Sequence, residues 1–253
     1  MNTLPRRDFI HAFASAVALS TMLQSRALAS PSQAITQWAQ NIADLNRDLS
    51  TGKIELTQWQ GRIAAFHADI DLSDLKKYLD FDRLTSAMQF PSSLAETADP
   101  KFPASINVAG TERKWFIRFF GMRKGGAIIP HVHNNMVSAH LVMEGSFHAR
   151  TFDRKADLAQ SVLLKPIRNE VIIPGQSVTM SDDRENAHWL IAEQDRSYTF
   201  DVGVLSISKT RTYGLKANDY AMIFVDPTGA AESNGLIRAP VISFDECVAK
   251  FAA

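Results

Sequence analysis

Histidines are the residues of this chain whose type and spacing point most clearly to chemistry. The chain has 253 residues and seven histidines, five of which fall between positions 131 and 188. His131 and His133 are two residues apart, a spacing that places both imidazoles on the same face of a β-strand. Because neutral imidazole is the commonest protein ligand for metals, these two residues and His188 are predicted to hold a divalent metal. The alternatives are two surface histidines on a strand and, for His188, a histidine packed beside Trp189.

The pattern around these histidines resembles the two motifs of the cupin family. The first motif has a glycine, His-x-His, four residues, a glutamate, six residues and a second glycine. Here Ser138 stands where the glutamate ligand would be, so one expected ligand is missing. The second motif has a Pro-Gly turn before the last metal histidine, and in this chain a longer loop than usual follows that turn. The matching positions are Gly125 or Gly126, His131, His133 and Gly145 in the first motif, and Pro174, Gly175 and His188 in the second.

A narrower resemblance accounts for the missing glutamate. The sequence is similar, over residues 115–208, to the cysteamine dioxygenases and plant cysteine oxidases, which bind iron with three histidines and no carboxylate. Those proteins have a methionine three residues after His-x-His, then a glycine, a histidine and an aspartate at set distances. Their third histidine lies in an Asn-x-His stretch before a strand that ends in Leu-Asp-Val. The matching positions here are Met136, Gly145, His148, Asp153, Asn186, His188 and Asp201.

The resemblance implies a cupin-type double-stranded β-helix, a mainly β jelly-roll barrel, with Fe(II) on His131, His133 and His188. Three neutral imidazoles on one face of an octahedron leave three positions open, so a thiolate and dioxygen can bind side by side. The expected activity is that of a non-haem iron dioxygenase acting on a small thiol or related small molecule. Two alternatives stay open: a non-catalytic cupin that binds a ligand or metal, and a Mn, Ni or Zn cupin isomerase or hydrolase.

Several residues near the histidines are expected to line the pocket or to support the ligands. His140 lies two residues after Ser138, so both should point into the barrel interior. His140 fits four roles: a fourth ligand, a group that supports the ligands, a substrate contact, or a core histidine whose ring nitrogens are hydrogen-bonded. Arg118 is interpreted as a solvated arginine on a strand, with binding of a substrate carboxylate as the alternative. The other candidates are His148 and Asp153 (a structural hydrogen bond), Asn186 (orienting His188 or capping its turn), Asp201 (anchoring a loop or accepting from an imidazole N–H), and the hydroxyls of Tyr198 and Tyr213.

The elements that position these residues change in type along the chain. Apolar residues at three- and four-residue spacing predict a helical N-terminal extension over residues 30–100, and residues 101–253 are expected to form the barrel and a C-terminal tail. His67, in the second helix, is interpreted as a structural or surface residue. Segments rich in branched and aromatic residues, separated by turn residues, predict the strands. The expected elements are helices at 35–45, 55–67 and within 72–88, strands at 115–120, 126–130, 136–144, 146–153, 161–165, 170–173, 187–193, 197–208 and 221–225, and a helix from Phe244.

The N-terminus has the features of an export signal. Arg6 and Arg7 precede an apolar run that is too short to remain as a membrane anchor, and Ala27 to Ala29 form a small-x-small cleavage pattern. Residues 1–29 are therefore predicted to be a twin-arginine-type signal peptide, which makes the twin-arginine export machinery a partner and the periplasm the destination. An ordinary secretory signal is the alternative. Export after folding would let iron bind before the protein meets the more strongly binding copper and zinc.

Charge and cysteine content limit the other function classes. The 27 basic and 27 acidic side chains give a net charge of zero, so nothing indicates binding to nucleic acid. Cys247 is the one cysteine, which excludes an intramolecular disulfide, and it is interpreted as a small buried hydrophobe. The expected partners are a small-molecule substrate and dioxygen, and a homodimer that pairs through sheet edges is a further expectation.

Overall fold

The described part of the protein consists of ten strands and five helices. The computed structural model describes residues 33–86, 88–102, 115–218 and 221–252. The strands are β1 (Trp115–Met122), β2 (Ala127–His133), β3 (Met136–Glu144), β4 (Phe147–Leu158), β5 (Ser161–Ile172), β6 (Ser177–Met180), β7 (Ala187–Ala192), β8 (Ser197–Leu205), β9 (Met222–Phe224) and β10 (Ile237–Pro240). The helices are α2 (Gln33–Ser50), α3 (Leu56–Asp69), α4 (Leu72–Leu79), α5 (Phe81–Ser86) and α6 (Phe244–Phe251).

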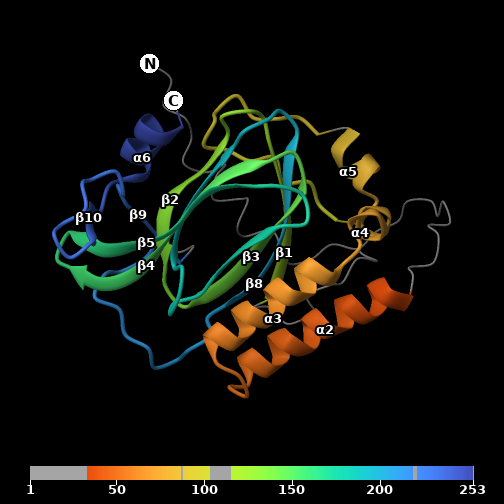
Figure 1. Cartoon of the computed structure of the whole chain (residues 1–253), viewed down its shortest axis with the longest axis horizontal. Coiled ribbons are helices and arrows are strands. Elements are labelled where there is room, and N and C mark those ends of the chain that lie inside the picture. Colours follow the sequence, from red (N-terminus) through yellow and green to blue (C-terminus); the bar gives the residue numbers. More distant parts are fainter. Residues whose placement is uncertain (1–32, 87, 103–114, 219–220, 253) are drawn as a thin grey trace.

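The strands form two antiparallel sheets that face each other (Figure 1). One sheet has the order β1-β8-β3-β6 and the other has the order β10-β5-β4-β7-β2-β9. The chain passes from one sheet to the other at every connection from β1 to β9 except the one between β4 and β5. This alternation is that of a double-stranded β-helix, so the predicted cupin-type jelly-roll barrel is confirmed.

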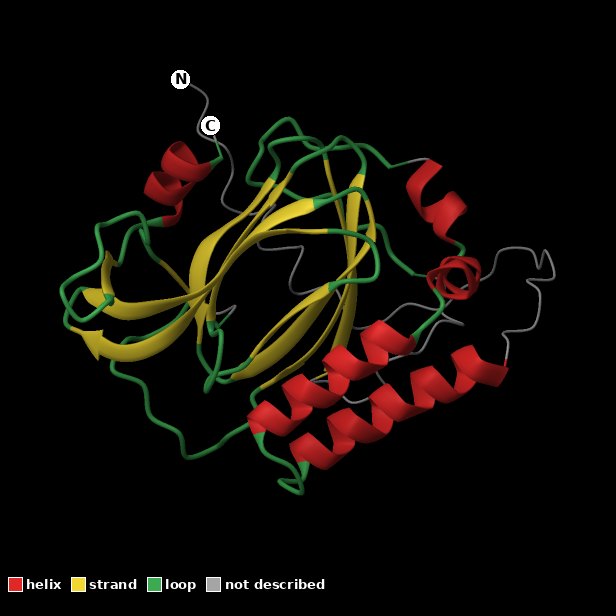
Figure 2. Ribbon diagram, viewed as in Figure 1, coloured by secondary structure: helices red, strands yellow, loops and turns green. Residues whose placement is uncertain are grey.

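The N-terminal helices cover the outer face of the four-stranded sheet (Figure 2). Their apolar residues recur at helical spacing, as in Ile35, Ile42 and Leu49 of α2, and these side chains are buried. They share one core cluster with the outward-facing residues of the sheet, such as Leu141 and Val202. The helices predicted from the apolar spacing are thus present, and they close one side of the barrel.

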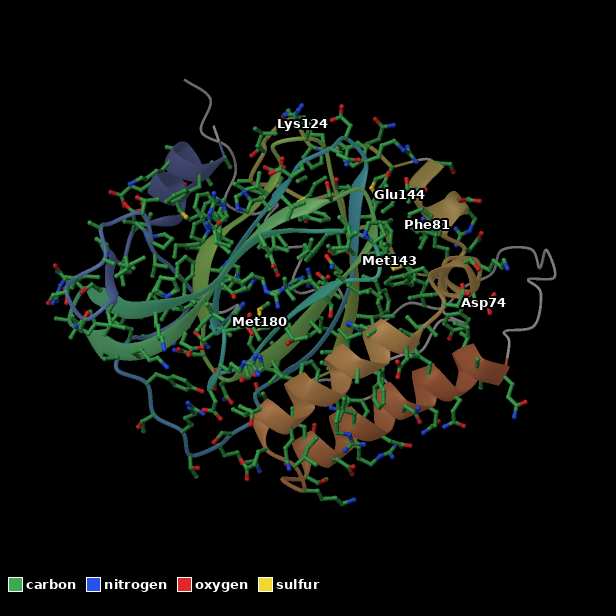
Figure 3. The ribbon with its side chains drawn as sticks, in the orientation of Figure 1. Asp74, Phe81, Lys124, Met143, Glu144 and Met180 are labelled. Carbon is green, nitrogen blue, oxygen red and sulfur yellow. The ribbon has the colours of Figure 1, made fainter. Side chains whose placement is uncertain are left out.

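Shorter helices close the end of the same sheet near the end of β3 (Figure 3). Phe81 of α5 and Met143 of β3 belong to the core cluster beneath the helices. Lys76 of α4 lies 3.0 Å from the carboxylate of Glu144 and 4.5 Å from the centre of the Phe81 ring. The pair is partly exposed, so we expect it to contribute on the order of 1 kcal/mol or less.

Three features of the fold differ from the sequence-based expectations. The strands predicted at 161–165 and 170–173 are one strand, β5, because a bulge opposite Thr151 and Phe152 accommodates Pro166 without ending the pairing. Strands β6 and β10 were not predicted. His67 is buried, so the surface interpretation of this residue is wrong and the structural one holds.

The predicted export signal at residues 1–29 lies outside the described residues. Within the part of the chain that is described, none of the helices is both long and apolar enough to cross a membrane.

Candidate metal centre

Strand pairing brings the three predicted histidines together. His131 of β2 lies directly opposite His188 of β7 in the antiparallel register, and His133 follows two residues later on the same face. One nitrogen of each ring lies within 4.8 Å of the others, and all three side chains are buried. Among the described residues this group contains no carboxylate. The predicted convergence of the three imidazoles is therefore confirmed.

The geometry of the three-histidine group fits a metal ion. Ligand nitrogens roughly 2.1 Å from a metal and at right angles to each other lie roughly 3 Å apart. The Nε2 atoms of His131 and His133 are 3.0 Å apart. The Nδ1 atom of His131 lies 2.7 Å from the carbonyl oxygen of Ile129, which can only accept, so Nδ1 carries the proton and Nε2 is left with its lone pair.

Burial keeps these imidazoles in the form that binds metals. Removal from water lowers the pKa of His131 to about 4, although its bond to the Ile129 carbonyl acts in the opposite direction. Burial also holds the pKa of His133 and of His188 well below the ordinary value, and the neighbouring imidazoles add to this effect. All three rings are therefore neutral at neutral pH, which is the protonation state required of a histidine ligand.

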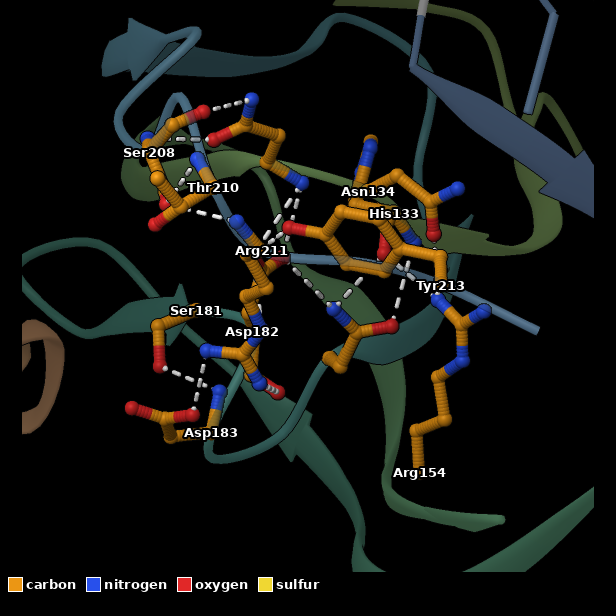
Figure 4. A network of polar contacts seen from close by, with 12 residues as sticks. His133, Asn134, Arg154, Ser181, Asp182, Asp183, Ser208, Thr210, Arg211 and Tyr213 are labelled. Carbon is orange, nitrogen blue, oxygen red and sulfur yellow. Dashed lines mark hydrogen bonds and ion pairs between the residues drawn. The ribbon is translucent and has the colours of Figure 1, made fainter. Parts of the chain in front are cut away.

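Asn186 joins the two strands that carry the ligands. Its side-chain oxygen accepts from the backbone N–H of His133 at 3.1 Å, and its side-chain nitrogen donates to the backbone oxygen of the same residue at 3.0 Å. Asn186 immediately precedes β7, two residues before His188. The sequence pointed to Asn186 as a partner of His188, whereas its side chain holds His133. Arg154, which the sequence analysis did not single out, donates to the same His133 oxygen at 2.8 Å (Figure 4).

A row of ionisable side chains faces the three-histidine group from the opposite sheet. Arg118 of β1, Asp201 of β8 and His140 of β3 lie side by side in the register of neighbouring strands. His140 Nδ1 is 2.8 Å from Asp201 Oδ2, although the two groups are not aligned as a hydrogen bond. The ring centres of His140 and His188 are 5.3 Å apart, which places His140 beside the ligand group.

Arg118 does not have the solvated position expected for it. It is 8% exposed, and one guanidinium nitrogen lies 3.4 Å from the carboxylate of Asp99. Burial raises the pKa of Asp99 to about 6, against the opposing effect of the Arg118 charge. The expectation failed because arginine side chains are mostly exposed, and only the strand register reveals that this one points inward.

A cavity separates the three-histidine group from the row of ionisable side chains. Its volume is about 100 Å³, which is smaller than the roughly 150 Å³ cavity known to bind benzene. Gly203 lies behind the cavity lining at a position where no side chain fits, because a Cβ there would lie 2.2 Å from the Phe116 ring and 2.7 Å from the backbone oxygen of Val137. The cavity lining is mostly apolar, which the sequence did not predict. The lining residues are Ala95, Thr97, Phe116, Arg118, Phe120, Ala127, Ile128, Ile129, His131, His133, Met136, Ser138, His140, His188, Asp201, Met222 and Phe224.

Several other predicted residues lie outside the cavity. His148 of β4 is not part of the cavity lining, and its ring forms the expected structural hydrogen bond, with the side chain of Asn169 of β5 at 2.7 Å. Asp153 accepts from the backbone of Glu185 at 2.9 Å. Tyr198 packs in the core beneath the helices, and Tyr213 bonds Asp182. Cys247 is buried, which raises the pKa of its thiol to about 12, in agreement with its predicted role as a small hydrophobe.

Comparison with known proteins finds similar solved structures at low sequence identity. No family model matches the chain, and no similar sequence was found among curated proteins. Among solved structures it is similar to KdgF from Halomonas sp. (13% identity, 38% of this chain and 74% of that chain, TM-score 0.30) and to procruciferin, an 11S globulin from Brassica napus (11%, 37% and 21%, 0.30). It is also similar to an oxalate oxidase (14%, 66% and 71%, 0.36).

Proposed function

We propose that this protein is a metal-dependent oxidoreductase, most specifically a non-haem Fe(II) dioxygenase that acts on a small thiol. The observation that carries the proposal is a buried group of three neutral imidazoles that lines a small cavity. The absence of a carboxylate from that group, among the described residues, supports iron with open positions over a site with four protein ligands. The sequence resemblance to cysteamine dioxygenases and plant cysteine oxidases supports the choice of a thiol.

Iron bound to the three imidazoles would supply adjacent positions for a thiolate and dioxygen and would favour loss of the thiol proton. The protein's own residues have three roles in this proposal. The bond from His131 Nδ1 to the Ile129 carbonyl fixes the orientation of that ring. The apolar lining, which includes Phe116 and Phe224, excludes water from the reacting groups. His140, with Asp201 beside its Nδ1, is placed to accept the thiol proton at Nε2.

The proposed reaction balances without a further reductant. A thiol and one molecule of dioxygen give a sulfinate and a proton, so sulfur loses four electrons and the two oxygen atoms gain four. Both atoms of dioxygen become bonded to sulfur, and the thiol proton leaves to solvent. A cavity of about 100 Å³ suits a thiol of only a few heavy atoms.

Metal content and oxygen uptake test the proposal directly. The purified protein is expected to contain about one iron per chain and to consume oxygen with one member of a panel that includes cysteine, cysteamine and a peptide with an N-terminal cysteine. His131→Ala should lose the metal, whereas His148→Ala, a histidine outside the cavity, should retain it. Bound iron with no oxygen uptake across the panel would refute the thiol assignment. Turnover without oxygen would instead favour a Mn, Ni or Zn isomerase or hydrolase, and bound metal without any turnover a binding cupin.

We also propose that the protein acts in the periplasm after export by the twin-arginine route. The proposal rests on the Arg6–Arg7 pair and the short apolar run that follows it. Changing both arginines to lysine should leave the protein, with its N-terminal segment uncleaved, in the cytoplasmic fraction. Export of that variant at the normal level would contradict this route.

A further inference from the structure

A segment that is not part of the cavity lining is hydrogen-bonded to the turn that follows the last residue of β2. We call residues 206–216 the strap. Ser208 exchanges two hydrogen bonds with the side chain of Asn135, at 2.8 and 2.7 Å. The backbone oxygen of Leu215 accepts from the side chain of Asn134 at 2.9 Å. Asn134 and Asn135 directly follow His133, so the strap holds the chain immediately beyond a candidate metal ligand.

The buried carboxylate of Asp182 is the centre of this network (Figure 4). Its two oxygens each lie 3.1 Å from the backbone nitrogen of Asn135, and it accepts from the hydroxyl of Tyr213 in the strap. The side-chain nitrogen of Asn186, which holds the backbone of His133, lies 3.5 Å from the same carboxylate. Asp182 thus contacts the strap, the turn after β2, and Asn186, whose side chain bonds the backbone of His133.

His133 needs such support because of its place in the fold. It is the last residue of β2, and the ends of strands are where backbone pairing stops. Outer residues that orient metal ligands commonly change metal affinity 10–100-fold when they are replaced. The network around Asp182 holds the chain at two points. Asn186 bonds the backbone of His133 itself, and Asp182 bonds the backbone of Asn135, two positions later.

We propose that Asp182 and Tyr213 are positioning residues for the metal centre, and that the strap acts through them to hold His133 in its ligand geometry. The proposal rests on the proposed function only in taking His133 to be a metal ligand. Asp182 does not itself contact the three-histidine group. Its effect passes through two sets of hydrogen bonds. The backbone N–H of Asn135 bonds Asp182, and the side chain of Asn186 bonds the backbone of His133.

The test compares Asp182→Asn with Asp183→Asn. Asp183 is adjacent in sequence and pairs with Arg211 of the strap at 2.8 Å, but it is exposed and makes none of the bonds to Asn135 and Asn186 that Asp182 makes. In the metal-free protein, hydrogen exchange at the His133 amide should be about tenfold faster in Asp182→Asn and unchanged in Asp183→Asn. With Co(II) as the probe metal, transfer to a chelator should be about tenfold faster in Asp182→Asn, and the visible absorption of the bound ion should shift.

A second variant, Tyr213→Phe, keeps the test decisive if Asp182→Asn does not fold. It removes one hydroxyl and should accelerate exchange and Co(II) loss in the same direction by a smaller factor. The proposal is overturned if both variants match Asp183→Asn in the exchange rate of the His133 amide. Failure of the wild-type protein to bind Co(II) would refute the metal centre instead, because the exchange measurement uses no metal.

Discussion

His67 should make the protein sensitive to acid, and its replacement should remove much of that sensitivity. The residue lies on α3 beneath the sheet, where its ring centre is 6.3 Å from that of Trp38. It is 1% exposed, and among the described residues neither ring nitrogen has a hydrogen-bond partner. Burial lowers the pKa of His67 to about 3, with a smaller effect from the charge of His140.

The sign of the effect follows from proton binding in the two states. In the unfolded chain the pKa of a histidine is roughly 6.5, so below that pH the unfolded state binds a proton that folded His67 excludes. Stability is therefore complete above roughly pH 6.5 and is lost as the pH falls toward the folded-state pKa of about 3. At roughly pH 4.5 the expected loss is about 2.7 kcal/mol. Because that pH lies well above the folded-state value, the loss depends mainly on the pKa in the unfolded chain.

Urea unfolding of His67→Leu and His67→Gln, followed by tryptophan fluorescence, measures this contribution. The proteins are compared without metal at roughly pH 8 and pH 4.5, so that the titration of the other histidines cancels in the difference. Between the two pH values both variants should lose about 2.7 kcal/mol less of their free energy of unfolding than the wild type does. An equal loss in all three proteins would refute the reasoning. At the higher pH, His67→Leu should also be more stable by about 1–3 kcal/mol, because it removes two unpaired polar atoms.

Three further predictions concern the cavity and the proposed metal. Replacing Asn186 with alanine should weaken Co(II) binding 10–100-fold in a chelator competition, because the backbone of His133 loses the two hydrogen bonds that the Asn186 side chain makes to it. Gly203→Ala should lower the free energy of unfolding by about 1–3 kcal/mol in urea and weaken ligand binding, since the backbone oxygen of Val137 cannot move aside as readily as a side chain. Removing the metal should lower the melting temperature. At a metal concentration of roughly 100 times Kd, the bound ion should stabilise the protein by about 2.7 kcal/mol in paired thermal scans.

The sequence was sufficient to predict which three histidines converge on one side of the cavity. His131 and His133 share a face because side chains alternate along any strand, whatever its partners are. His188 could be identified from its place after a Pro-Gly turn and from its neighbour Asn186. The partner of Asn186 could not be predicted, because it lies on another strand 53 positions away in sequence. The continuity of β5 through Pro166 was equally hidden, since a bulge depends on the partner strand.

The sequence did not predict which side chains of the opposite wall are neighbours, because that depends on register across three strands. Residues 118, 140 and 201 become neighbours only when β1, β8 and β3 pair as they do, and a shift of one residue would turn each side chain to the other face. A buried row of ionisable side chains contributes little net stability, since apolar residues of similar volume commonly replace buried ion pairs without loss. Because the row faces three neutral imidazoles across a small cavity, it fits the proposed reaction site better than a purely structural role in the core.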